Sequence, residues 1–376
     1  MKKLSRRQWK IDVRNGILHR RGHSKNTRKN GRNKGIVNGF DVNKWIDTQK
    51  EKGLNALANG NRVTIVLPEQ LNFSKDYDTT ALHLNAIRKL TQYKYLSPRA
   101  YRLESVNFDY ITSISTSAAL VLTAEISKWD DSVRNRLTPN IEKWNPDILV
   151  NFNELGFFDL FKNKPVNLDR FDGAARHNRK IVKYIKGRCG DDQKTRVLKE
   201  NITQIVGNKI KKWTFLHSGS SEAIVNVSHH AYPKENGYSE IDKNWYLTAS
   251  YNTIKRELKV VFYDQGIGIP KSLPASDLWE KALEFLSIFP IAERKKDEVL
   301  LKAAVELDRT RTEESDRGKG LPDLLEFIRQ RCDGYLSILS LKGLFKLEIK
   351  GGVETVRSEH FEHPVNGTLI IWSVTV

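Results

Sequence analysis

The chain of 376 residues contains only two cysteines, Cys189 and Cys332, and their spacing is not that of a metal-ligand set. No apolar run approaches the roughly 20 residues that a membrane-spanning helix needs. The basic N-terminus lacks the apolar core of a secretory signal. These absences argue against a disulfide-rich secreted domain and a membrane protein, and they predict a cytoplasmic protein without membrane contacts. A hydrophobic content of 39% with eight tryptophans indicates a globular protein.

The positive charge is unevenly placed along the chain. Residues 1–40 hold thirteen Lys or Arg and one acid, Asp12, which gives this stretch +12 of the net +18. A basic arm of this composition can contact a phosphate backbone, so nucleic acid or another polyanion is a predicted partner of residues 1–40. The alternative is a solvated tail that aids solubility.

Residues 41–170 alternate between helix and strand patterns. Helices are predicted from apolar residues at helical spacing, and strands from short apolar runs bounded by turn signals. The predicted elements are a helix over Val42–Ala58, a strand over Arg62–Leu67, a helix over Thr79–Thr91, a strand over Val106–Ile111, a helix over Ser115–Trp129 and a short strand over Ile148–Val150. This alternation predicts the α/β fold class.

Two stretches of this region, Ile114–Leu120 and Leu155–Phe161, carry a resemblance to a known family. The order of elements is similar to that of STAS-like domains, small α/β modules that partner bacterial anti-sigma kinases. The resemblance implies an α/β domain that binds a protein partner, with Ser117 in the place of a serine that can be phosphorylated. Ser115 and Ala118 stand where the family has Asp and Gly. The alternative is that these hydroxyl residues cap the following helix.

The next stretch, 171–217, is charged and has apolar residues at core-like intervals, so it is predicted to be a helical connector. After it comes the first of three segments that carry chemistry. A helix capped at Ser218 or Ser220 would place Glu222, Asn226 and His230 on one face, because they are spaced four residues apart. An acid, an amide and an imidazole on an otherwise apolar helix suit the wall of a site.

The second segment follows two predicted strands, Trp245–Tyr251 and Leu258–Tyr263. Asp264 ends the second strand, and its carboxylate can accept a hydrogen bond from an exocyclic amine. Gly266 and Gly268 follow where the backbone must bend or approach a ligand. A glycine-rich turn after a strand is the simpler alternative.

The third segment, Gly318-Lys319-Gly320-Leu321, opens a predicted amphipathic helix. Free backbone N–H groups at a helix N-terminus favour phosphate, and a lysine adds a point charge. The spacing is neither that of a Walker A loop nor that of a dinucleotide fingerprint. Taken alone, this segment is an ordinary loop before a helix.

In this order and spacing, the three segments and the late Gly367-Thr368 resemble the four boxes of the GHKL (Bergerat-fold, histidine-kinase-like) ATP-binding family. The resemblance covers residues 218–376 and is closest to the anti-sigma serine-kinase branch, which fits a STAS-like region upstream. It implies an α/β sandwich with a mixed sheet and helices on one face. Residues 271–317 would form a lid, and helices are predicted there at Leu278–Leu286 and Lys296–Leu307.

The resemblance also implies roles for single residues. Asn226 would hold Mg²⁺, and Glu222 would be the catalytic residue that orients or deprotonates the attacking group. Asp264 would bind the adenine amine, with support from Thr368. The other predicted ATP-binding residues, on the phosphate and lid side, are His230, Gly266, Gly268, Gly318, Lys319, Gly320 and Leu321. One of Arg309 and Arg311 is predicted to pair with the γ-phosphate; the alternative is a solvated basic turn.

Two functions stay open on the sequence alone. The first is a Mg²⁺-dependent ATPase or serine/threonine protein kinase, coupled to the STAS-like domain as its regulatory or partner-binding module. The second is an ATP-gated module that binds nucleic acid or protein with little turnover. The predicted catalytic residue Glu222 favours the first, and the basic arm favours the second. A homodimer is expected because GHKL relatives commonly pair.

Overall fold

The computed structural model describes residues 41–376 apart from 93–98, 130–133, 135–140, 163, 165–177, 189–190, 192–193, 208–209, 234–235, 237, 239–242, 277–278, 312–319 and 332. The predicted basic arm, residues 1–40, lies outside the described residues, as do Gly318 and Lys319. Within the described part of the chain, every helix is too short or too polar to span a bilayer.

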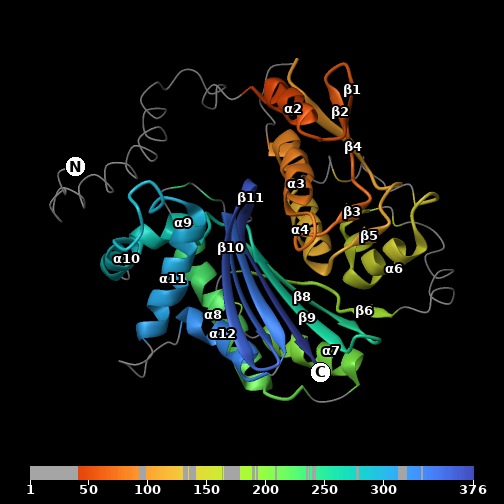
Figure 1. Ribbon diagram of the computed structural model, residues 1–376. Coiled ribbons are helices and arrows are strands. Elements are labelled where there is room, and N and C mark those ends of the chain that lie inside the picture. Colours follow the sequence, from red (N-terminus) through yellow and green to blue (C-terminus); the bar gives the residue numbers. More distant parts are fainter. Residues whose placement is uncertain are drawn as a thin grey trace.

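The N-terminal unit, residues 41–161, alternates helices with short strands (Figure 1). Its helices are α2 (Val42–Glu51), α3 (Tyr77–Gln92), α4 (Thr116–Ser127) and α6 (Pro146–Leu155), and its strands are β1 (Ala56–Asn59), β2 (Arg62–Val66), β3 (Gln70–Leu71), β4 (Arg102–Asn107) and β5 (Ser113–Ile114). β2 pairs antiparallel with β1 and parallel with β4, and β3 pairs parallel with β5. Parallel strands joined through a helix confirm the predicted α/β class.

Two elements of this unit differ from the prediction in extent. The helix predicted over 42–58 ends at Glu51, because residues 56–59 pair with β2 as an edge strand. The strand predicted over 106–111 lies earlier, as β4, because its parallel register with β2 runs from Arg102 to Asn107. In both places tertiary pairing overrides the local pattern.

The strand predicted over 148–150 is wrong in kind, because these residues belong to α6. Asn145 accepts the N–H of Asp147 at 2.8 Å as an N-cap, and Pro146 occupies the first helical position. The predicted cap of α4 is confirmed: Ser115 Oγ accepts the N–H of Ala118 at 3.1 Å.

The C-terminal part of the chain is built on a six-stranded sheet. Its strands are β6 (Arg179–Ile181), β7 (Ile185–Arg188), β8 (Asn244–Asn252), β9 (Glu257–Asp264), β10 (Gly334–Lys350) and β11 (Val353–Thr375). The order is β10-β11-β9-β8, and β6 and β7 both pair with the far edge of β8. Every described pair is antiparallel, so the predicted mixed sheet is wrong. Hairpin connections such as those from β8 to β9 and from β10 to β11 require antiparallel strands.

The segment predicted as a helical connector contributes two of these strands. Residues 179–188 form β6 and β7 on the open edge of β8, and only α7 (Lys194–Val206) is the expected helix. The next helix, α8 (Trp213–Asn226), starts earlier than its predicted cap. Ser220 lies inside α8 and donates its hydroxyl to the carbonyl of Leu216 at 2.8 Å.

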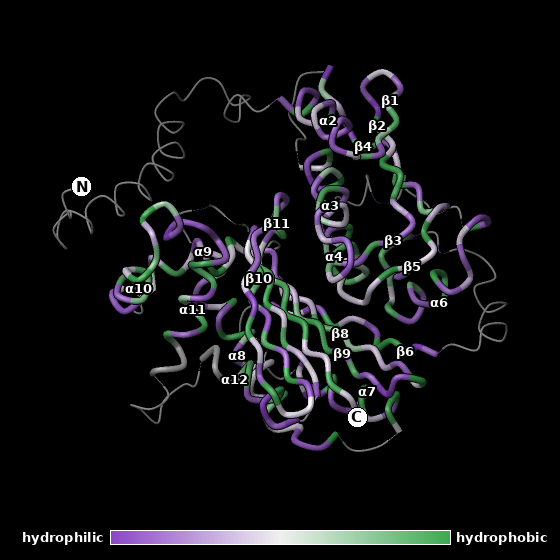
Figure 2. Tube along the Cα trace, in the orientation of Figure 1, coloured by the Kyte–Doolittle hydropathy of each residue, from purple (hydrophilic) through white to green (hydrophobic). Residues whose placement is uncertain are grey.

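Both faces of the sheet are covered. Side chains alternate along β9: Val260 and Phe262 pack toward α8, α11 (Asp297–Arg311) and α12 (Gly320–Arg329), whereas Val261 and Tyr263 pack toward α3 and α4. Much of β8 and β9 is accordingly coloured as hydrophobic in Figure 2. The prediction placed helices on one face only; in the structure the N-terminal unit covers the other.

The β10–β11 hairpin is longer than the rest of the sheet and doubles back on itself. Its bend lies at a register shift around Leu341, whose φ is +53°. At the tip, the N–H of Gly351 bonds to Asp333, which directly precedes β10, and Glu354 pairs with Arg329 at the end of α12. The tip of the hairpin is thereby linked to the start of β10 and to the end of α12.

Candidate functional site

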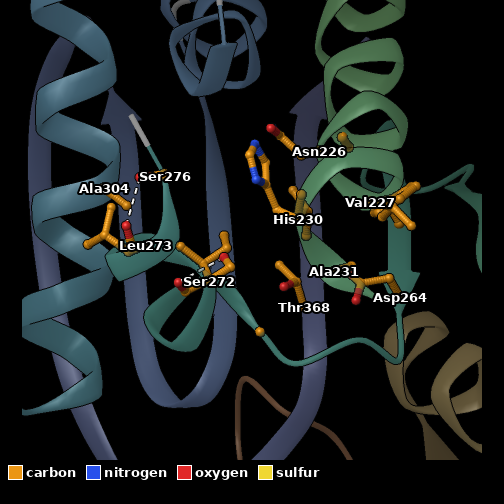
Figure 3. Close-up of a pocket in the computed structure, with 15 residues that line it drawn as sticks. Asn226, Val227, His230, Ala231, Asp264, Ser272, Leu273, Ser276, Ala304 and Thr368 are labelled. Carbon is orange, nitrogen blue, oxygen red and sulfur yellow. Dashed lines mark hydrogen bonds between the residues drawn. The ribbon is translucent and has the colours of Figure 1, made fainter. Parts of the chain in front are cut away.

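A cavity that opens to solvent, with about 720 Å³ of empty space including its mouth, lies between the sheet and the helix layer (Figure 3). It is lined by the end of α8 and the turn after it, by the end of β9 with the loop and short helix α9 (Ile269–Ser272) that follow, and by β11. The lining includes five residues predicted for the ATP site: Asn226, His230, Asp264, Gly268 and Thr368. Segments far apart in the sequence thus meet at one cavity.

The sheet register brings three polar residues into one row across its strands. Asp264 of β9 pairs with Thr368 of β11, which pairs with Ser340 of β10. Directly opposite residues project on the same side of a sheet, so this polar row lies on the face covered by α8. Thr368 hydrogen-bonds to the Asp264 carboxyl group through its side chain and its N–H, and Asp264 Oδ1 accepts the N–H of Gly266 at 2.8 Å.

The carboxyl group of Asp264 is the buried acid of the cavity, with 3% of the residue exposed. Burial raises its pKa to about 6, although the hydrogen bonds from Gly266 and Thr368 and the charge of Lys128 oppose the shift. The group therefore changes its hydrogen-bonding character close to neutral pH. It offers only acceptors when ionised and one donor when protonated.

The two glycines after Asp264 let the loop run against its neighbours. A Cβ at Gly266 would lie 2.5 Å from both the Cβ and the carbonyl oxygen of Ala231, and that carbonyl accepts the N–H of Ile267 at 2.9 Å. Gly268 has a φ of +84°, and a Cβ there would come within 2.9 Å of Ser340 Oγ. Gly268 lines the cavity, whereas Gly266 provides contact with the end of the helix region.

α8 passes into a single π-helical turn, Val227–Ala231, where it reaches the cavity. Such turns are rare and are often found at functional sites. Asn226 ends α8, His230 lies in the π turn, and Figure 3 shows both side chains pointing from the helix toward the opposite wall. The predicted catalytic residue Glu222 lies one turn before Asn226 and outside the residues that line the cavity.

Ser340 does not line the cavity but supports its polar row, and the sequence does not predict this role. Its hydroxyl donates to the carbonyl of Gly367 and accepts the N–H of Ile269, both at 2.9 Å, and lies 3.3 Å from Thr368 Oγ1. It is completely buried. A serine inside an apolar strand carries no motif, and only the strand pairing identifies it.

The apolar walls were also missed, because their residues look like ordinary core positions in the sequence. They come from α8 and the π turn, from the central strands and from the helices beyond β9: Ala223, Val227, Phe262, Leu273, Ala304 and Ile370. A concave apolar site with a few polar groups is the usual form of a small-molecule pocket.

The wall opposite α8 belongs to the predicted lid region. The helices predicted at 278–286 and 296–307 are confirmed as α10 (Trp279–Leu286) and α11. A role as a lid stays a prediction. Arg309 and Arg311 belong to the end of α11, and their side chains lie outside what the structure describes. Gly320 and Leu321 open α12, as expected.

No protein-family model matches the chain, and no curated protein matches it. Among the described residues, no three His, Cys, Asp or Glu side chains gather as a metal-ion site.

Proposed function

We propose that the chain binds ATP in this cavity and acts as a GHKL-type, Mg²⁺-dependent ATPase or protein kinase. One observation supports the proposal most: five residues from separate sequence segments that resemble an ATP site, Asn226, His230, Asp264, Gly268 and Thr368, line one cavity. If the polar helix face, the glycine turn and Thr368 had unrelated roles, they would not be expected to meet at one cavity.

The inner part of the cavity suits an adenine ring. Phe262, Ile370 and Val227 supply apolar walls, and the buried Asp264 supplies a carboxyl group beside them. An apolar slot with one fixed polar group both holds a flat ring and orients it. When Asp264 is ionised it accepts a hydrogen bond from the exocyclic amine of adenine, and Thr368 holds the carboxylate in place.

The rim formed by Asn226 and His230 suits the phosphates. The amide oxygen of Asn226 is a ligand type that Mg²⁺ accepts, and this metal commonly shares its coordination between a protein oxygen and nucleotide phosphates. The donor set fits a metal that arrives with the nucleotide, because no cluster of acids is described there. Bound Mg²⁺ would supply charge neutralisation on the phosphates. Glu222, in the adjacent turn of α8, would orient or deprotonate the attacking water or hydroxyl group.

The N-terminal unit would be the STAS-like, regulatory or partner-binding module of this enzyme. Ser117, in the place of the family's phosphorylated serine, is 5% exposed, and its hydroxyl lies 3.1 Å from that of Ser115. A phosphoryl group cannot be added there unless the start of α4 opens. Partner binding is therefore expected without phosphorylation of Ser117 in the folded unit.

The test is Mg²⁺-dependent release of γ-phosphate from ATP, with ATP binding measured in parallel by calorimetry. The wild type is expected to bind ATP, and Asp264→Ala to lose that binding. Glu222→Ala is expected to bind ATP without turnover. Glu200→Ala, which removes an exposed carboxylate from α7, is the matched control and is expected to behave as the wild type.

The outcomes separate the enzyme from the binding module. Turnover in the wild type that survives in Glu222→Ala would remove the catalytic role of that residue. ATP binding without phosphate release in either protein would indicate a kinase that awaits its substrate, or an ATP-gated module. A wild type that does not bind ATP would overturn the proposal.

A further inference from the structure

The net charge of the chain is concentrated in two stretches rather than one. Besides the arm, residues 178–213 contain eleven Lys or Arg and three acids, a net of +8. All the other residues together carry −2. The second basic stretch, unlike the first, belongs largely to the described part of the chain, as the end of β7, α7 and the start of α8.

Seven cations of this stretch lie on β7, on α7 and directly before α8, and they are called here the basic band: Lys186, Arg188, Lys194, Arg196, Lys199, Lys211 and Lys212. At one end, Lys194 Nζ donates to the carbonyl of Lys186 at 2.9 Å. At the other end, Lys199 Nζ lies 6.0 Å from the centre of the Trp213 ring, directly after Lys212 in the chain. Between the two ends, the band follows α7 from Lys194 to Lys199, a rise of about 8 Å along the helix axis.

The charge of the basic band is barely compensated. Only Lys194 has a carboxylate partner in the described part of the chain, Asp191 at 2.8 Å, and the other six cations make no ion pair there. Lysines on an edge strand commonly serve to prevent strand pairing, which accounts for Lys186 and Arg188 on β7. That explanation does not extend to cations on a helix or before one. Burial and the like charges of Arg134 and Arg188 lower the pKa of Lys186, as expected where cations crowd together.

The aromatic residues of this surface indicate what kind of polyanion it takes. Proteins that bind single-stranded nucleic acid stack bases on open aromatic rings. Here the Trp213 ring is covered by Lys199, and the Phe215 ring by Lys212 at 5.8 Å from its centre. The band therefore offers charge without stacking platforms.

We propose that the basic band binds the phosphate backbone of double-stranded nucleic acid, without reading its sequence. The band and the cavity lie at opposite ends of α8, since Trp213 begins this helix and Asn226 ends it. The proposal does not depend on the nucleotide site and can be tested in the absence of ATP. It is also separate from any contact through residues 1–40, which stay present in every protein compared.

The test measures the binding of the full chain to a 30-base-pair DNA duplex between 50 and 300 mM salt. The variant Arg196→Gln, Lys199→Gln, Lys211→Gln removes three exposed charges of the band. The matched control Lys75→Gln, Lys295→Gln, Lys350→Gln removes three exposed charges elsewhere. Each lost phosphate contact is expected to lower the slope of log affinity against log salt by about 0.9, and affinity at 0.1 M salt on the order of tenfold. The band variant should show this loss and the control should keep the wild-type slope.

Four results would overturn the proposal. They are no duplex binding by the wild type at 50 mM salt, an equal loss in the band variant and its control, tighter binding of a single strand than of the duplex, and binding of the band to anionic vesicles but not to duplex. Equal loss would mean that net charge alone matters. Circular dichroism and thermal unfolding of both triple variants confirm that the comparison is between folded proteins.

Discussion

The side-chain amide of Gln265 donates to the carboxyl group of Glu125 across 3.2 Å, from Nε2 to Oε2. Gln265 directly follows Asp264, and Glu125 lies in α4 on the opposite face of the sheet. Both side chains are buried, with Gln265 1% and Glu125 7% exposed. The bond therefore ties the loop of the candidate site to the N-terminal unit.

α3 holds the other flank of the same site. Tyr77 Oη accepts the N–H of Val365 at 3.1 Å, and Asn85 Nδ2 donates to the carbonyl of Pro364 at 3.0 Å. These residues of β11 come just before Thr368. The N-terminal unit is thus bonded to both sides of the polar row, and a partner that moves α3 or α4 would move the cavity as well.

Glu125→Ala is expected to weaken ATP binding although the residue lies outside the cavity. It leaves Gln265 Nε2 buried without a partner, beside an Oε1 that already has none, and each such orphan costs about 1–3 kcal/mol. Glu125→Gln keeps an acceptor and is the matched control. Urea unfolding and ATP calorimetry check both variants. The coupling is absent if Glu125→Ala loses stability while its ATP affinity stays at the wild-type value.

The parts of the fold that could be predicted are those with a clear period or a local cap. β8 and β9 are apolar runs bounded by turns, and α3 and α4 show helical spacing. The strand prediction within α6 is wrong because Ile148, Leu149 and Val150 form a run too short to distinguish a strand from a buried helix. Asn145 and Pro146 indicate a helix, because asparagine favours the N-cap and proline the first helical position.

What could not be predicted depends on pairing between distant segments. β6 and β7 join the sheet by pairing with β8, which lies about 60 residues further along the chain. The second face of the sheet is buried by the N-terminal unit. The sequence of that unit does not indicate that it packs against the sheet. In the site, motif residues were found because their chemistry is unusual, whereas Ser340 gains its role only through its register with Thr368.

Ser340→Ala is expected to lower the free energy of unfolding by about 1–3 kcal/mol, because it leaves the N–H of Ile269 without its acceptor. Ser337→Ala is the matched control: this buried serine lies on the same strand but pairs with Ile371, on the face toward α4. Chemical unfolding of the two variants measures the difference. Equal losses would show that the Ser340 bonds do not hold the loop.

Gly266→Ala is expected to move the loop away from the π turn. Its new Cβ would meet the Cβ and carbonyl oxygen of Ala231 at 2.5 Å, and overpacking of this kind costs about 1–3 kcal/mol. Gly60→Ala is the control, since nothing lies within 4 Å of its Cβ and only backbone strain at φ +60° is added. Both variants should lose some stability, but only Gly266→Ala should weaken ATP binding. Calorimetry that finds wild-type affinity in Gly266→Ala would contradict the tight approach.

Asp264 is expected to make stability and ATP affinity respond to pH in opposite directions. Its folded pKa of about 6 lies above the value of about 3.9 for an unfolded aspartate. Between these values the folded state binds more protons, so the contribution of Asp264 to the free energy of unfolding is full below about pH 4 and is lost as pH rises to about 6. The difference between the two pKa values corresponds to a loss of about 3 kcal/mol.

Asp264→Asn removes this titration. Comparing it with the wild type therefore isolates the effect of Asp264 on the pH dependence of stability and of ATP affinity. The free energy of unfolding of the wild type, relative to the variant, should fall between pH 4 and pH 6 and stay constant above. ATP affinity of the wild type should rise about tenfold per pH unit up to about pH 6, since only the ionised carboxylate accepts the adenine amine without donating a proton. The pH dependence of ATP affinity in Asp264→Asn reflects the titration of the ATP phosphates, which affects both proteins equally. If the two proteins show the same pH dependence of ATP affinity, Asp264 does not contact the base.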